Sequence, residues 1–159
     1  MLTSVVKISS LATSLLVIFV FAFLLHFVWE MWQIPFYEDM LEASHWSAVI
    51  QCTRATFGDG VIAIAAYSVS AIVVRDAAWL YCRKFRTWTL YLLIGLLATV
   101  LIEFLSTEVY DRWQYSDSMP IVPILNTGVT PLLQWAVLPP IYLWMSAVFL
   151  QGLGNSANK

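Results

Sequence analysis

A histidine and a glutamate lie one helical turn apart inside a long apolar stretch of the chain. His26, Glu30 and Gln33 follow the spacing i, i+4, i+7, which places all three on one face of a helix. An imidazole and a carboxylate that are screened from water can share or relay a proton. We therefore interpret His26 and Glu30 as a candidate acid–base pair. The alternative is that they hydrogen-bond each other and the backbone and only hold helices together.

The rest of the composition indicates what must position these residues. Sixty per cent of the 159 residues are apolar and 11% are charged, whereas soluble domains average about 45–50% and about 25%. A net charge of -2, no basic tract and only two cysteines argue against disorder, nucleic-acid binding and a disulfide scaffold. The sequence predicts an all-α integral membrane bundle of four transmembrane helices, in one domain that covers residues 1–159. The expected spans are about 11–34, 55–74, 88–105 and 129–151, with outer loops 35–54 and 106–128 and a basic inner loop 75–87.

Basic residues indicate the orientation of these spans. Six of the eight lysines and arginines fall on one side, and the positive-inside rule makes that side cytoplasmic. We therefore expect both termini to be cytoplasmic in a multi-pass protein of the cell (inner) membrane. These six residues are Lys7, Arg75, Arg83, Lys84, Arg86 and Lys159.

This topology brings polar residues of different spans to one depth. His26 and Glu30 lie in the outer part of the first span, Asp59 near the outer end of the second and Glu103 near that of the third. Charges cost about 2.5–3.5 kcal/mol each at the bilayer centre, so their gathering predicts a shared polar pocket that opens outward. The candidate catalytic residues are His26, Glu30 and Glu103. The candidate substrate-binding residues are Asp59, Gln33, Gln134, Trp135 and Tyr115.

Helical spacing predicts which faces point inward. Thr99, Glu103 and Thr107 repeat every four residues in the third span. In the second span, Asp59 begins a face of small residues that would allow close helix packing. That face continues through Ala63, Ala66 and Ser70.

Three of these features have a second interpretation. Asp59 follows the glycine-containing segment 54–60, so it would also serve as a helix N-cap after a tight turn. The aromatic and proline-containing segment 113–120 would form either a lid over the pocket or a packed interfacial loop. Trp135 would line a substrate site or only pack between helices.

Metal and thiol chemistry receive little support. Glu42 and His45 have the i, i+3 spacing of carboxylate-bridged di-iron bundles, but no second copy of the motif exists. The alternative is an amphipathic interfacial helix over residues 38–45. Cys52 and Cys82 fall on opposite sides of the membrane and predict no disulfide. We expect no metal and no cofactor.

Residues 25–41, Leu-His-Phe-Val-Trp-Glu-Met-Trp-Gln-Ile-Pro-Phe-Tyr-Glu-Asp-Met-Leu, resemble the first helix and following loop of emopamil-binding-protein sterol isomerases of the EXPERA group. The pair Gly58-Asp59 and the aromatic last helix are also similar. The resemblance implies a small bundle in which His26 and Glu30 shuttle a proton during double-bond migration. It also implies that Trp135 or Trp144 stabilises a carbocation. Around Tyr115 to Pro120 the chain is similar to small uncharacterised bacterial membrane proteins, which implies a fold only.

Three functions are compatible with the sequence. The first is an isomerase-like acid–base enzyme, or a binder, for a hydrophobic lipid or isoprenoid. The second is a non-enzymatic accessory subunit of a membrane complex that binds a partner or pigment. The third is a metal-ion or proton site. The expected partners are the lipid bilayer and either a hydrophobic small molecule or a membrane protein, with no nucleic acid.

Overall fold

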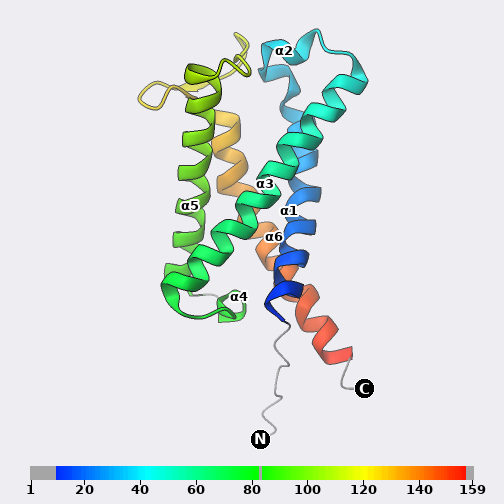
Figure 1. Ribbon diagram of the computed structural model, residues 1–159, viewed down its shortest axis with the longest axis vertical. Coiled ribbons are helices and arrows are strands. Elements are labelled where there is room, and N and C mark those ends of the chain that lie inside the picture. Colours follow the sequence, from blue (N-terminus) through cyan, green and yellow to red (C-terminus); the bar gives the residue numbers. More distant parts are fainter. Residues whose placement is uncertain (1–9, 83, 157–159) are drawn as a thin grey trace, which may run out of the picture.

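Four long helices dominate the computed structural model, which describes residues 10–82 and 84–156 (Figure 1). Each of them is long and apolar enough to cross a membrane. The all-α, four-helix prediction is therefore confirmed, and the chain has the make-up of a multi-pass membrane protein. The four helices are α1 (Leu11–Gln33), α3 (His45–Val74), α5 (Phe85–Phe104) and α6 (Val129–Ser156).

Local sequence signals explain where α1 and α3 begin and end. Ser10 caps α1 by accepting the Thr13 backbone N–H at 3.2 Å, and Ser44 caps α3 in the same way. Helix α1 gives way to a 3₁₀ turn at Pro35, whose ring disfavours a continuing α-helix. Helix α3 ends at Arg75 in the left-handed conformation, with φ of 54°.

Short elements connect the long helices at the two ends of the bundle (Figure 1). We call the end that carries α2 and residues 110–128 the loop end, and the opposite end, where α1 begins and α6 finishes, the terminal end. The loop end contains the 3₁₀ turn η1 (Ile34–Phe36), α2 (Glu38–Leu41), the π-helical turn η2 (Leu105–Val109) and an antiparallel pair, β1 (Ile121–Val122) with β2 (Thr127–Gly128). The terminal end contains α4 (Trp79–Cys82).

Predictions for two segments, 54–60 and 38–45, are wrong because the helices begin and end at other residues than expected. Asp59 lies inside α3, and Ser44 provides the N-cap, so neither the tight turn over 54–60 nor the capping role of Asp59 exists. Glu42 and His45 are not on one helix, because α2 ends at Leu41 and α3 begins at His45. The predicted amphipathic helix over 38–45 is therefore interrupted.

Helix packing separates the two ends of the bundle. Helix α1 packs against α3 and α6, and α5 packs against α6 and α3. In Figure 1, α3 lies close to α5 at the terminal end and leans away from it toward the loop end. Ala63, Ala66 and Ser70 are fully buried, which confirms that the small-residue face of α3 points inward.

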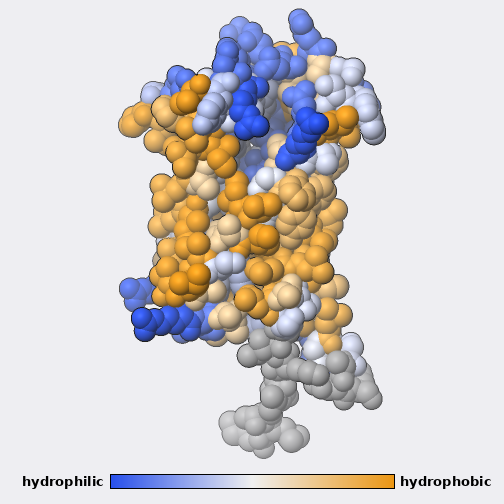
Figure 2. All heavy atoms as spheres, viewed as in Figure 1, coloured by the Kyte–Doolittle hydropathy of each residue, from blue (hydrophilic) through white to orange (hydrophobic). Residues whose placement is uncertain are grey.

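The outer surface carries a broad apolar band between two polar ends (Figure 2). Large exposed side chains such as Leu97, Val28 and Ile72 belong to the long helices. Such a surface suits lipid and not water. Arg75, Lys84 and Arg86 lie beside or at the start of helices at the terminal end, whereas Lys7, Arg83 and Lys159 fall outside the described residues.

Candidate functional site

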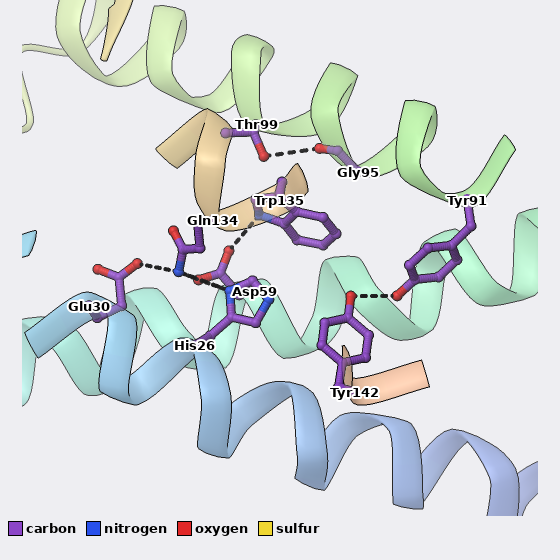
Figure 3. Close-up of polar contacts among 9 residues, drawn as sticks. All are labelled: His26, Glu30, Asp59, Tyr91, Gly95, Thr99, Gln134, Trp135 and Tyr142. Atoms are coloured by element: carbon purple, nitrogen blue, oxygen red, sulfur yellow. Dashed lines mark hydrogen bonds and ion pairs between the residues drawn. The ribbon is translucent and has the colours of Figure 1, made fainter. Parts of the chain in front are cut away.

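Side chains from three helices meet inside the loop-end half of the bundle (Figure 3). His26 and Glu30 come from α1, Asp59 from α3 and Gln134 from α6. The Gln134 side-chain nitrogen lies 2.9 Å from His26 Nδ1 and donates to Glu30 Oε1 at 3.0 Å. The same nitrogen is 3.5 Å from Asp59 Oδ2. We call these four residues the polar cluster.

Trp135 supports the polar cluster from the next position of α6. Its indole N–H donates to Asp59 Oδ1 at 3.2 Å, and its ring lies 5.2 Å from the His26 ring. The ring sits against α5 at Gly95, where an added Cβ would come within 2.2 Å of an indole carbon. Gly95 is therefore required for Trp135 to reach Asp59.

The contacts at His26 Nδ1 concern a single proton. This nitrogen is 2.9 Å from the Gln134 amide nitrogen and 3.2 Å from Asp59 Oδ2. The first contact needs Nδ1 as an acceptor, whereas an ionised Asp59 needs it as a donor. A proton on Asp59 Oδ2 satisfies both contacts, whereas a proton on Nδ1 would face the Gln134 amide N–H and break the first. An imidazole and a carboxylate so placed can pass that proton between them.

Two of the buried groups have polar atoms without a partner among the described residues. His26 is fully buried and its Nε2 has no hydrogen bond. Gln33, one turn beyond Glu30, is 3% exposed, and its carbonyl oxygen also lacks a partner. Buried polar atoms are normally hydrogen-bonded. Of these two, only Gln33 lines the pocket described below, so only its carbonyl oxygen is open to a bound molecule.

Glu103 belongs to a second polar group. Its Oε2 accepts hydrogen bonds from the Tyr115 hydroxyl at 2.5 Å and from Trp113 Nε1 at 3.3 Å. Burial and the neighbouring carboxylate raise the pKa of Tyr115 above its ordinary range, so the hydroxyl stays a donor. Glu103 is 7% exposed and makes no direct hydrogen bond to the polar cluster.

One pocket of about 550 Å³ joins the two groups. Glu30, Asp59, Gln33, Glu103, Gln134 and Trp135 all line it. His26 lies behind them, held by Gln134, and Tyr115 reaches the pocket only through Glu103. Thr99 also lines the pocket, whereas Thr107 does not. The structure thus brings the predicted residues to one place, and their individual roles remain predictions.

Residues 113–116 pack beside this pocket, and Trp113 is the one of them that lines it. The Ser116 backbone N–H donates to the Phe36 carbonyl at 3.0 Å, and the Ser116 hydroxyl donates to the Pro35 carbonyl at 2.9 Å. The Glu38 N–H donates to the Gln114 carbonyl at 2.9 Å, and Tyr37 forms a bridge with Tyr115. These bonds favour the packed loop over the mobile lid.

Sequence reasoning missed several residues of the pocket. Trp113 gives a donor to Glu103, and Tyr37 adds a buried ring to the lining. Arg54 and Arg112 also line the pocket and are exposed at its mouth. Arg54 precedes Asp59 by five residues, and Arg112 precedes Trp113. Their short distance in sequence from candidate residues is the one sequence feature that could have indicated these two arginines.

The described residues contain no group of three or more His, Cys, Asp and Glu side chains that could hold a metal ion. Cys52, buried in α3, and Cys82, exposed in α4, are both free. No family model, curated protein or solved structure matches the chain. The site must therefore be interpreted from its own chemistry.

Proposed function

We propose that the protein is a membrane-embedded acid–base enzyme for a hydrophobic lipid or isoprenoid molecule. The observation that carries the proposal is the polar cluster of His26, Glu30, Asp59 and Gln134, which three helices hold beside a pocket. Collecting two carboxylates and an imidazole inside an apolar bundle is costly, and such residues commonly serve function. The pocket volume of about 550 Å³ falls within the range of small-molecule sites.

Double-bond migration is the reaction that this cluster suits best. A proton is added to one carbon of the double bond, and another proton leaves the carbon on the far side of the second double-bond carbon, so the double bond moves by one position and no electron acceptor is needed. Glu30 lines the pocket and would exchange protons with the substrate, while Asp59 in the lining and His26 behind it share another proton. The Gln134 amide holds these groups in place through its contacts with His26 and Glu30 of α1 and with Asp59 of α3. The resemblance of residues 25–41 to EXPERA isomerases supports the same reaction class.

Orientation follows from charge. The basic side chains of Arg75, Lys84 and Arg86 at the terminal end favour a cytoplasmic position for both termini in the inner membrane. The pocket would then open toward the extracytoplasmic side. A substrate would reach it from the lipid or from that surface.

The test compares lipid profiles of cells that lack the protein with those of cells that carry it. Wild-type protein should restore the missing product, and Glu30→Gln should fail to restore it while matching the wild type in abundance and thermal stability. Loss of one acid–base group typically costs about 10²–10⁴-fold in rate. The control is Glu42→Gln, because Glu42 is exposed and outside the pocket lining.

Two results would contradict the proposal. Full complementation by Glu30→Gln would show that its carboxylate has no chemical role. A variant that fails only because the bundle unfolds would make the cluster a structural link and would favour the accessory-subunit function.

A further inference from the structure

One face of α3 descends from the mouth of the pocket to its floor. The residues on this face that line the pocket are Gln51, Arg54, Ala55, Gly58, Asp59 and Ile62. At a rise of about 1.5 Å per residue, Arg54 lies about 7–8 Å above Asp59 and about 12 Å above Ile62. The lining therefore changes from basic at the mouth, through acidic, to apolar.

The mouth carries two arginines from different elements. Arg54 comes from α3, and Arg112 comes from the loop that follows η2. Both are exposed, and neither forms an ion pair within residues 10–82 and 84–156. The Arg112 guanidinium lies 5.8 Å from the centre of the neighbouring Trp113 ring. Among the acidic residues of the lining, Asp39 is exposed like the two arginines, whereas the other three are half-buried or buried.

The deeper carboxylates differ from the arginines because each of them already accepts at least one hydrogen bond from a side chain of the described residues. Glu30 and Asp59 accept from Gln134 and Trp135. Glu103 accepts from Trp113 and Tyr115. The unused hydrogen-bonding capacity at the mouth thus consists of cationic donors, which fit an anion.

The shape of the pocket suits a molecule with a head and an apolar body. Figure 2 shows a hollow beneath the hydrophilic groups of the loop end, bordered by apolar side chains. Ile62 and Ile102 line it from α3 and α5, the two helices that lean apart toward the loop end (Figure 1). An apolar chain can lie between these helices while its head group remains at the mouth.

We propose that the pocket binds an amphiphile with a phosphate head group, which Arg54 and Arg112 hold at the mouth while the apolar body reaches the polar cluster. A guanidinium presents paired N–H donors that match the oxygens of a phosphate. Holding the head fixes the depth of the body and thus which carbon lies beside Glu30. The inference rests on the proposed function, since it names the substrate class of the same pocket.

The test measures equilibrium binding of tritiated dodecyl phosphate to the full-length protein in phosphatidylcholine nanodiscs, with empty nanodiscs as the blank. Arg54→Gln and Arg112→Gln should each raise the Kd about threefold to tenfold. Arg86→Gln is the matched control, because Arg86 is an exposed arginine at the terminal end, and it should leave the Kd unchanged. Excess inorganic phosphate should compete only at much higher concentration, since it lacks the apolar body.

Three results would overturn the inference. Arg54→Gln and Arg112→Gln could bind dodecyl phosphate as tightly as the wild type, or Arg86→Gln could weaken binding as much as they do. The wild type could also bind dodecyltrimethylammonium more tightly than dodecyl phosphate. The Glu30→Gln variant separates this inference from the proposed function. It should still bind dodecyl phosphate, because Arg54 and Arg112 are intact, while it fails to restore the product. If Glu30→Gln changes the lipid profile but dodecyl phosphate does not bind, only the head-group inference is wrong. If dodecyl phosphate binds as expected but Glu30→Gln restores the product, only the acid–base function is wrong.

Discussion

The two halves of the bundle fill their interiors with different chemistry. The terminal half is closed by aromatic side chains, with the Tyr67 and Trp79 rings stacked at 4.8 Å and Trp79 lying 5.8 Å from Tyr91. The loop-end half contains carboxylates, an imidazole and amides around a pocket. Aromatic packing closes the first half, whereas the second half gathers ionisable groups that are costly to bury. Buried polar atoms without a partner occur in both halves of the described bundle, as at Ser70 and Ser146 in the first and at Gln33 in the second.

This difference indicates how a small bundle can keep a pocket open. Helices α3 and α5 lean apart at the loop end, so their association depends on packing at the terminal end. Burial of large rings there supplies stability that the polar half cannot supply. Substitutions in the two halves should therefore separate stability from function.

The largest effect is expected from Trp79→Ala. Trp79 is 1% exposed, and its indole N–H donates to the Tyr67 carbonyl at 3.4 Å. Its loss should lower the free energy of unfolding by about 3–5 kcal/mol, because a large cavity forms between α4 and α3. Unfolding in a mild detergent, followed by circular dichroism, measures this change. Trp46→Ala is the control, because Trp46 is 70% exposed on α3, and a similar loss there would remove the distinction between the halves.

Gly95→Ala tests the boundary between the halves. The added Cβ would stand 2.2 Å from the Trp135 ring, which must move and lose its hydrogen bond to Asp59. We expect a loss of about 1–3 kcal/mol in unfolding free energy, together with a loss of function. Gly152→Ala is the control, because nothing lies within 4 Å of its added Cβ. Normal function in Gly95→Ala would show that the position of Trp135 is unimportant.

The sequence was sufficient to predict the four long helices and the meeting of polar residues from different helices at one level of the bundle. Hydropathy and length decide where a helix can cross a membrane, and alternating direction then brings His26, Asp59 and Gln134 to one level. Small residues on α3 also predicted its buried face, since Ala63 and Ala66 allow close approach.

The rotation of each helix about its axis, and the side chains that meet as a result, could not be predicted from the sequence. That Gln134 and Trp135, adjacent on α6, both reach Asp59 depends on the angle between helices and on the space above Gly95. The early start of α3 depends on the Ser44 cap, which has no hydropathy signal. The mouth arginines belong to separate elements, and only the folded chain shows them around one pocket.

Tyr115→Phe tests how residues 113–116 are held beside the pocket in the loop-end half. It removes the hydroxyl that donates to Glu103, and a hydrogen bond to a charged group typically contributes about 1.5–3 kcal/mol. The loss should appear as faster hydrogen exchange in residues 110–128. If hydrogen exchange in residues 110–128 stayed unchanged, the hydrogen bonds of Ser116 would be sufficient to hold residues 113–116 in place.

The same tyrosine predicts a dependence of stability on pH. Burial raises the pKa of Tyr115, so the folded protein keeps the phenol protonated while the unfolded chain ionises near its ordinary value of about 10. This contribution to stability is therefore complete below pH 10 and declines as pH rises above it. Thermal melts between pH 8 and about 11 should show a smaller decline for Tyr115→Phe than for the wild type. An equal decline in both would exclude Tyr115 as its source.

The smallest effects are expected from two hydroxyls that lie where the two halves meet. Tyr91 donates to the Ala63 carbonyl at 3.1 Å, so the 2.7 Å bond between the two phenols must use the proton of Tyr142. Tyr142→Phe leaves Tyr91 with a partner and should cost about 0.5–1.5 kcal/mol. Tyr91→Phe removes the acceptor of a fully buried hydroxyl and should cost more. Unfolding of the two variants in one detergent compares them directly. A larger loss of unfolding free energy for Tyr142→Phe would show that Tyr91 is the donor between the two phenols. If either variant lost as much unfolding free energy as Trp79→Ala, polar contacts would also stabilise the bundle strongly.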